Sequence, residues 1–145
     1  MIKLTLMKIV PFIFIIFLTF GSCRKENSID KFPQKWQLIS MSGQITNSVT
    51  TGPDMEWQET YLLNSNGTFS KSRERDGILT EASGTFMIKN LSDGKFLELT
   101  FNSATNLVAS CTPGLKETLW VQSERKMTGT WSYCDGPGLE YERVE

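Results

Sequence analysis

The 145-residue sequence predicts an all-β fold, in which about eight antiparallel strands follow one another as an up-and-down meander and close into a barrel. Asn-Gly or Asp-Gly pairs occur at 66–67, 76–77 and 93–94, each between runs of strand-forming residues. Such pairs adopt the positive φ angles of tight hairpin turns, so they indicate strands that pair with their neighbours. No window shows an apolar period of 3.6 residues over helical length. Closure is favoured over a sandwich because it removes both edge strands.

The first four strands are separated in part by the first two of these turns. In the first strand Trp36 and Leu38 alternate with Gln37, which predicts one apolar face. Alternation is weakest in the third strand, where Phe69 is the only apolar residue. We therefore expect one side of the third strand to face solvent and the other a polar or rim region of the barrel. The expected ranges are 35–42, 56–64, 67–75 and 79–89.

The last four strands continue the same pattern to the C-terminus. In the sixth strand Leu119 and Val121 share one face with Glu117. The seventh strand is expected to place Trp131 and Tyr133 on one face, with hydroxyl residues opposite. The expected strands are 95–102, 115–122, 126–133 and 139–144, and long polar loops are expected at 43–55 and 102–114.

Residues 1–22 have the pattern of a secretory signal peptide. Two lysines precede the apolar block 9–20, which is too short for a membrane-spanning helix of about 20 residues. Small residues precede Cys23, and charged residues begin directly after it. This arrangement resembles the lipobox of bacterial lipoproteins, although Phe20 stands where that family has an aliphatic residue. The alternatives are an ordinary signal peptide that is cut nearby and an uncleaved anchor.

The lipobox resemblance implies that Cys23 becomes the first residue of the mature chain and carries several acyl chains, palmitate among them. Several chains anchor a protein firmly, whereas one chain binds a membrane only marginally. Residue 24 is arginine and not aspartate, so nothing indicates retention at an inner membrane. We therefore expect the outer membrane of a Gram-negative cell, in either leaflet. The polar segment 23–34 is then a tether, and residues 35–145 form one domain.

Removal of residues 1–22 takes away two of the 15 basic residues and none of the 16 acidic residues, which leaves a mature net charge of −3. No basic cluster is interleaved with aromatic residues, so nucleic-acid binding has no support. Cys111 and Cys134 remain once Cys23 is lipidated. In an oxidising compartment we expect them to form a disulfide, because the hairpin of the sixth and seventh strands brings its two ends together. The alternative is two free thiols.

The sequence lacks the motifs that common catalytic and metal sites need. There is no histidine, which removes Ser-His-Asp and Cys-His catalysis and the commonest metal ligand. No Cys-x-x-Cys pair occurs, and no glycine-rich phosphate loop opens a helix. The acidic pairs Glu56 with Glu59 and Glu140 with Glu142 are expected on solvated faces. The sequence therefore predicts no enzyme, no metal site and no cofactor.

From residue 33 to the end, the order of several short motifs resembles the lipocalin-like domains of small exported bacterial lipoproteins. The chain departs from lipocalins in two places, because Gln34 replaces the glycine of their Gly-x-Trp motif and no C-terminal helix follows the last strand. The resemblance implies a closed lipocalin-like barrel in which Arg143 stacks on Trp36 by a cation–π contact. The alternative for Arg143 is an ion pair with a surface acid. The motifs are QKWQLIS at 34–40, NGTF at 66–69, SGTF at 83–86 and GTWSYCDGPGLEYERV at 129–144.

The leading functional hypothesis is a non-enzymatic, lipid-anchored lipoprotein that binds a small apolar ligand in the barrel. Trp57, Tyr61, Trp131 and Tyr141 are the candidate lining of its cavity, which is expected at the open end with a volume of a few hundred Å³. The other interpretation of these aromatic residues is a packed core. An eight-stranded barrel is just wide enough for either arrangement.

The alternative hypothesis is a structural or protein-interaction envelope lipoprotein with no small-molecule ligand. It would be a packed barrel, or a domain similar to the META type of exported β domain, whose first strand begins with Trp-x-Leu as in Trp36-Gln37-Leu38. The Gly-Cys-Asn motif usual in META domains is absent. Such a protein would work through the loops 43–55 and 102–114, and it predicts an exposed apolar patch near them.

Overall fold

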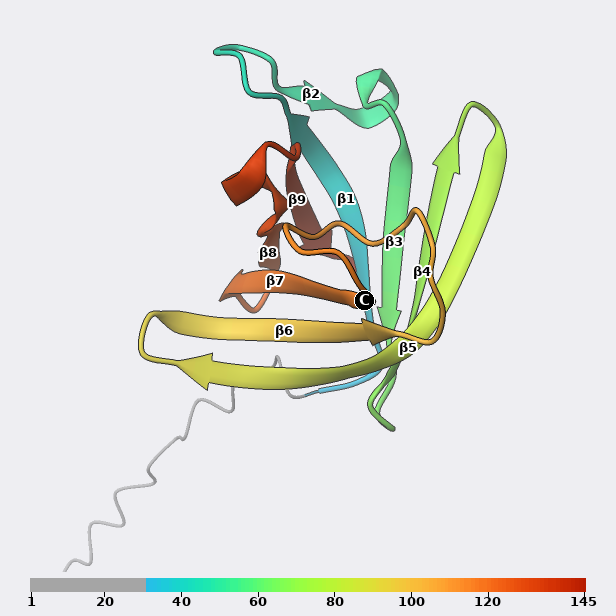
Figure 1. The fold of residues 1–145 in the computed structure, drawn as a ribbon, viewed down its shortest axis with the longest axis vertical. Coiled ribbons are helices and arrows are strands. Elements are labelled where there is room, and N and C mark those ends of the chain that lie inside the picture. The colour runs from blue at the N-terminus through green and yellow to red at the C-terminus, as the bar shows by residue number, and fades with distance from the viewer. Residues whose placement is uncertain (1–30) are drawn as a thin grey trace, which may run out of the picture.

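The computed structural model describes residues 31–145, which form one antiparallel sheet that curves round on itself (Figure 1). The predicted signal peptide, Cys23 and most of the tether lie outside these residues. Two short 3-10 helices, η2 (Gly52–Asp54) and η3 (Trp131–Cys134), lie in the connections. The strands are β1 (Gln34–Ser42), β2 (Thr50–Thr51), β3 (Gln58–Leu63), β4 (Thr68–Arg75), β5 (Ile78–Leu91), β6 (Gly94–Phe101), β7 (Lys116–Ser123), β8 (Lys126–Gly129) and β9 (Gly138–Arg143).

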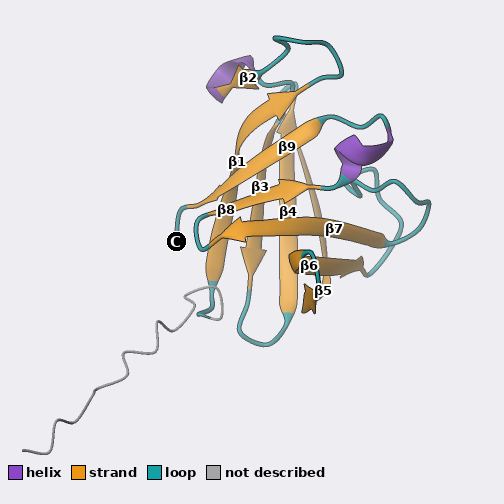
Figure 2. Cartoon of the chain, turned by 90° about the vertical axis from the view of Figure 1, so that its left-hand side faces the viewer, coloured by secondary structure: helices purple, strands orange, loops and turns teal. Residues whose placement is uncertain are grey.

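The strands form a closed barrel, as predicted. Consecutive strands pair antiparallel from β3 to β9, and β1 pairs with both β3 and β9. The result is an eight-stranded barrel in meander order, with β2 outside it against β1 (Figure 2). The three predicted turns contain glycines at positive φ, namely 78° at Gly67, 74° at Gly77 and 151° at Gly94. Asn-Gly and Asp-Gly pairs therefore set the hairpins of β3 to β6.

The barrel closes where the first and last strands pair. Trp36 lies opposite Arg143, and Leu38 lies opposite Tyr141. Directly opposite residues of an antiparallel pair share one face of the sheet, so these side chains belong to the inner face. A register shift between Leu38 and Ser40 then turns the end of β1, so that Met41 is buried in place of its neighbour.

The long strand β5 bends round the barrel at Gly84. This residue lies opposite Phe69 of β4 and also opposite Phe101 of β6, and the two phenylalanine rings meet edge to face at 5.0 Å. A Cβ atom at Gly84 would lie 2.0 Å from the carbonyl oxygen of Thr100. Only glycine lets β4, β5 and β6 approach each other this closely, which permits the bend.

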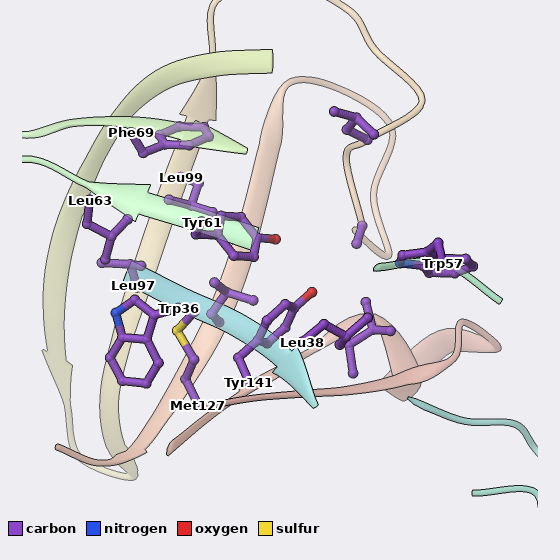
Figure 3. Close-up of a cluster of buried hydrophobic side chains, with 14 of the residues drawn as sticks. Trp36, Leu38, Trp57, Tyr61, Leu63, Phe69, Leu97, Leu99, Met127 and Tyr141 are labelled. Carbon is purple, nitrogen blue, oxygen red and sulfur yellow. The ribbon is translucent and has the colours of Figure 1, made fainter. Parts of the chain in front are cut away.

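Apolar side chains fill the barrel from the end that holds Trp36, which is called the closed end, to its middle (Figure 3). Trp36 marks the closed end, where its Nε1 donates a hydrogen bond of 2.9 Å to Oε1 of Gln34. Tyr61 and Tyr141 cross the middle with ring centroids 5.2 Å apart, and their hydroxyl groups point away from the closed end. The other fully buried apolar side chains are Leu38, Leu63, Phe69, Leu99, Phe101, Leu107, Leu119 and Met127.

The structure corrects the prediction of a strand at 126–133. The strand β8 ends at Gly129, and residues 131–134 form η3 instead. The chain leaves the sheet after Thr130, which still donates to the carbonyl of Thr118 on β7 but has helical backbone angles, φ −88° and ψ 0°. The carbonyl of Thr130 then accepts from the amide of Tyr133 at 3.1 Å, which starts the 3-10 turn. Tyr133 therefore does not share an inner face with Trp131, and it is 71% exposed.

Candidate functional site

Four ionisable side chains meet inside the barrel near the end that carries the long loops. Glu59 extends from β3, Lys71 and Arg73 extend from β4, and Glu117 extends from β7. All but Arg73 have fully buried side chains, and Arg73 is 11% exposed. They lie inside because alternate residues of a strand share a face, as Lys71 does with Phe69. These four residues are called the buried cluster.

Lys71 is the centre of the buried cluster. Its Nζ lies 3.1 Å from Oε1 of Glu59 and 3.0 Å from Oε2 of Glu117. It also donates a hydrogen bond of 2.7 Å to the main-chain carbonyl of Leu107. A lysine ammonium has three N–H donors, and here each has an acceptor. The ring of Tyr61 adds a cation–π contact, with its centroid 4.8 Å from Nζ.

The two carboxylates of the cluster accept further hydrogen bonds. The hydroxyl of Tyr141 donates to Oε1 of Glu59 at 2.6 Å, and that of Tyr61 donates to Oε1 of Glu117. Nε of Arg73 donates to Oε2 of Glu59 at 2.6 Å. Two negative and two positive charges therefore cancel inside the barrel, and buried charges are tolerated when they are paired in this way.

Burial and pairing separate the two carboxyl groups in acidity. Burial raises the pKa of Glu117 above its ordinary value, against the opposing effect of Lys71, and the charge of Glu59 adds to the rise. Burial also acts to raise the pKa of Glu59, but the charges of Lys71 and Arg73 outweigh it and hold that pKa below its usual range. Burial and the adjacent carboxylates raise the pKa of both tyrosine hydroxyls well above its usual range, so both stay protonated donors.

The loop 102–115 covers the buried cluster. Leu107 and Ala109 are each 1% exposed and pack on the core. Besides the carbonyl that accepts from Lys71, the loop provides the amide of Ala109, which donates to Oε2 of Glu117 at 3.1 Å. The loop is thus fixed to the cluster by one main-chain acceptor and one main-chain donor. The prediction of a polar loop here is right in sequence range but misses this inward apolar anchor.

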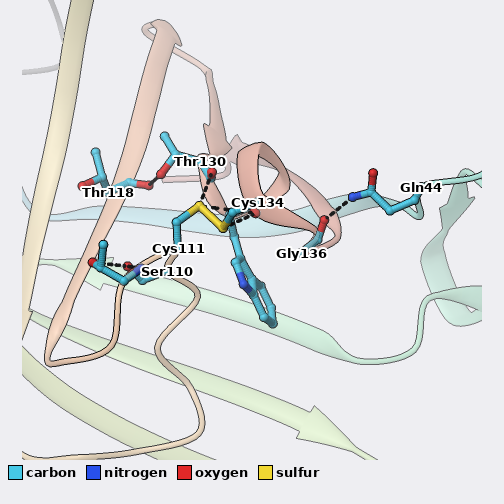
Figure 4. Close-up of a disulfide and its surroundings, with 9 residues drawn as sticks. Gln44, Ser110, Cys111, Thr118, Thr130, Cys134 and Gly136 are labelled. Carbon is cyan, nitrogen blue, oxygen red and sulfur yellow. Dashed lines mark hydrogen bonds between the residues drawn. A yellow bond between two sulfur atoms is a disulfide. The ribbon is translucent and has the colours of Figure 1, made fainter.

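A disulfide joins this loop to η3, as Figure 4 shows. The predicted pairing of Cys111 with Cys134 is present, with Cα atoms 5.5 Å apart. The segment after η3 is held in turn by Gln44, whose Nε2 donates to the carbonyl of Gly136 at 2.9 Å. Three loops at this end of the barrel, which is called the loop end, are therefore connected to one another by covalent and polar contacts.

The structure places the four candidate cavity residues in three different surroundings. Tyr61 and Tyr141 are completely buried and donate to the cluster. Trp57 lies farther out, with the guanidinium of Arg73 4.4 Å from the centre of its ring (Figure 3). Trp131 lies on η3, where it packs against Gly136 so closely that a Cβ there would be 2.3 Å from the indole. A cavity beside Trp36 at the closed end has a volume of about 10 Å³, room for one water molecule at most.

The predicted meeting of Trp36 and Arg143 is confirmed in register, because the two residues are direct partners across β1 and β9. The guanidinium of Arg143 donates to main-chain carbonyls, from Nε to Glu145 at 2.9 Å and from Nη2 to Lys31 at 3.3 Å. The lysine and arginine side chains of β4 form cation–π contacts with Tyr61, Phe101 and Trp57. The stack of Arg143 on Trp36 stays a prediction.

Sequence reasoning placed Glu59 on a solvated face, which is wrong, and it did not identify the cluster. A signal was present, because Glu59, Lys71 and Glu117 each occupy the same alternating positions as apolar residues of their strands. The weak alternation around Phe69 predicted a polar region beside the third strand. The partners of Lys71 in this region could not be named from the sequence, because they lie on β3 and on β7.

The outer wall of the barrel is hollowed between η3 and the loop 43–49. This hollow has a volume of about 420 Å³ and is called the outer groove. Its lining includes Trp120 of β7, Tyr133 of η3 and Val49 of the loop. Val49 is 63% exposed, and Ile45 of the same loop is 79% exposed.

Within residues 31–145, no helix is long and apolar enough to cross a membrane, and no three histidine, cysteine or acidic residues gather as metal ligands would. Comparison of the chain with protein-family models, with curated proteins and with solved structures finds no match.

Proposed function

We propose that this protein is a non-enzymatic, lipid-anchored envelope lipoprotein whose barrel is a packed scaffold, and that it acts through the surface of its loop end. The observation that carries the proposal is the filled interior. The buried cluster, both tyrosines and the inward side chains of loop 102–115 occupy the end of the barrel where a ligand would enter. Of the two functional hypotheses, this favours the one without an apolar ligand inside the barrel.

A ligand inside the barrel would have to displace the loop. Removal of Leu107 and Ala109 would break the hydrogen bonds to Lys71 and Glu117 and expose two buried apolar side chains. An apolar ligand that took their place would leave the ammonium and the carboxylate with unsatisfied groups, at a cost of about 1–3 kcal/mol for each. The disulfide of Cys111 further restrains the loop.

The position of the N-terminus supports an outward role for the loops. The described chain begins next to Trp36 at the closed end, whereas the loops 43–57, 102–115 and 130–137 gather toward the other end (Figures 1 and 2). If Cys23 is lipidated, the tether attaches the closed end to the membrane. The loop end then faces away from the membrane and is free to meet partners.

The loop end carries the exposed apolar side chains that an interaction protein is expected to have. Ile45, Val49 and Tyr133 are all largely exposed, and they come from two neighbouring connections. Most of the surface of a soluble protein tolerates single apolar residues, but a group of them marks an interaction site. Ile45, Val49 and Tyr133 are not members of the buried cluster, so scaffold and surface use different residues.

Native mass spectrometry of the lipidated protein, purified from its own host, tests the proposal. We expect the mass of the acylated chain with no additional small molecule. A stoichiometric apolar compound that is retained would reject the packed scaffold and restore the ligand-binding hypothesis. A titration with the apolar dye N-phenyl-1-naphthylamine gives a second measurement, because saturable one-to-one binding would lead to the same rejection.

A further inference from the structure

The floor of the outer groove is formed by paired strands of the barrel wall. A row of outward-facing residues forms its floor across four strands, because Trp120 pairs with Thr128, Thr128 with Glu140, and Glu140 with Ser40. The next residues along these strands, such as Leu119 and Met127, point inward and are buried. The floor therefore rests on the packed core and has a fixed shape.

Two side chains rise beside this floor. Tyr133 on η3 is 71% exposed, and Val49 on the opposite loop is largely exposed as well. The disulfide fixes η3, and the bond from Gln44 to the Gly136 carbonyl connects the loop to it. The walls are therefore ordered before any ligand arrives, which lowers the entropy cost of binding.

The chemistry of the groove is a hydroxyl floor beside aromatic faces. The hydroxyl groups of Ser40 and Thr128, with those of Ser42 and Ser132 nearby, form no hydrogen bond to another group in residues 31–145. Each can both donate and accept. An acyl chain or an apolar peptide side chain laid on this floor would cover these hydroxyls without pairing them, which is unfavourable.

The charged residues of the groove further restrict the class of ligand that it can bind. Glu140 is the one charged side chain among those that line the groove, and Lys126 compensates it with Nζ 2.7 Å from Oε1. No lysine or arginine lines the groove, so nothing in it would attract phosphate, sulfate or a carboxylate. The volume of about 420 Å³ lies within the usual range of small-molecule sites.

We propose that the outer groove binds an uncharged saccharide, with Trp120 and Tyr133 against the C–H faces of the sugar and the hydroxyls of Ser40 and Thr128 on its polar edge. A sugar ring is a compact ligand that presents hydroxyl groups on its edge and apolar C–H groups on its faces, and the groove offers a partner for both. This site rests on the proposed function, since it gives a ligand class to the surface at the loop end. It does not involve the barrel interior.

Saturation-transfer NMR on the full lipidated chain in bilayer nanodiscs tests the site. The neutral probes are triacetylchitotriose, which represents an N-acetylated wall glycan, and maltotriose and cellotriose, which represent external glucans. The anionic control is trigalacturonate. We expect saturable binding of at least one neutral trisaccharide and weaker binding of trigalacturonate, and the better neutral probe indicates the source of the sugar.

Three variants assign the binding to the groove. Tyr133→Ala removes an exposed ring and is expected to weaken binding about tenfold, as for the loss of an aromatic stacking contact. Thr128→Val keeps the shape and removes one hydroxyl, with an expected loss of about fivefold. Ile78→Ala is the matched control, because Ile78, the first residue of β5, is 69% exposed and does not line the groove, so this variant should bind as the parent does.

The proposal is overturned if none of the three neutral probes binds, if trigalacturonate binds most tightly, or if binding is unchanged in both groove variants. These failures leave the packed scaffold intact, because that scaffold is tested by the apolar molecules that the protein retains. A retained apolar compound, in contrast, would reject the packed scaffold but would not change the effect of Tyr133→Ala on trisaccharide binding.

Discussion

Lys71→Met is the perturbation that examines the buried cluster most directly. Methionine fills a similar volume, so the change removes the charge while it preserves much of the packing. It takes away the counter-ion that lies 3.1 Å from Glu59 and 3.0 Å from Glu117, and it orphans the carbonyl of Leu107. Glu59 keeps Arg73 as a partner, whereas Glu117 is left with only neutral hydrogen-bond donors.

The expected loss follows from this difference. Removal of one partner of a buried ion pair costs about 3–5 kcal/mol in unfolding free energy, because the remaining charge is buried without compensation. We expect Lys71→Met to lose about 4 kcal/mol at pH 7, within that range. Urea unfolding of the disulfide-intact protein, followed by tryptophan fluorescence, measures the change in unfolding free energy.

The dependence on pH has a definite sign. Without Lys71 the pKa of Glu117, already raised, rises further, so the folded variant holds a proton that the unfolded chain releases. Stability of the variant therefore falls as pH increases between the ordinary carboxyl range and this raised pKa. The deficit relative to the parent should be larger at pH 8 than at pH 5.

A double variant supplies the control for this reasoning. Lys71→Met combined with Glu117→Leu removes both members of the pair, and it should be less destabilised than the sum of the two single variants, because no isolated charge remains. Additive losses, or a loss below about 1 kcal/mol for Lys71→Met alone, would show that the ammonium is not the ion that the cluster requires.

Three further outcomes are expected. Gly84→Ala should lose about 3 kcal/mol of unfolding free energy, because its Cβ would lie 2.0 Å from a carbonyl oxygen, whereas Gly77→Ala, on an open turn, should lose less in the same urea assay. Replacement of Cys111 and Cys134 by serine should cost about 3 kcal/mol, since the bridge spans a sequence separation of 23 residues; the protein without reductant should resist thiol alkylation, and full alkylation would reject the bridge. Cys23→Ser should move the protein out of the membrane fraction or block its cleavage, and unchanged fractionation would reject the lipid anchor.

The barrel could be predicted because the signals for its hairpins and inner face lie within short stretches of sequence. Asn66-Gly67 and the other two turns define hairpins within a few residues, and alternation around Trp36 defines an inner face. Closure followed because a meander of this number of strands removes its edges when the last strand returns to the first. The pairing of Trp36 with Arg143 could be predicted for the same reason, because antiparallel closure places the end of β9 beside the start of β1.

The buried cluster and η3 depend on contacts that are distant in sequence. The buried ammonium of Lys71 is stable only because it pairs with Glu59 and Glu117. The sequence of each strand alone cannot show that these inner positions of β3, β4 and β7 converge. The seventh strand was extended too far because Trp131 and Tyr133 continue its alternation. The helical backbone of Thr130, the 3-10 bond from Tyr133 to its carbonyl and the disulfide at Cys134 override that pattern.

The buried cluster fixes the position of loop 102–115 at the loop end of the barrel. A purely apolar interior would tolerate many placements of loop 102–115, because hydrophobic contacts are not directional. The cluster instead requires one carbonyl and one amide at defined points, those of Leu107 and Ala109, and misplacing either leaves a buried ion without its partner. Once the loop is fixed, the disulfide holds η3, and η3 carries the wall of the outer groove. Loss of the ammonium should therefore weaken saccharide binding at a surface that Lys71 does not touch. If Lys71→Met, measured under conditions where it remains folded, binds the neutral trisaccharide as tightly as the parent, the cluster stabilises the barrel but does not position the groove.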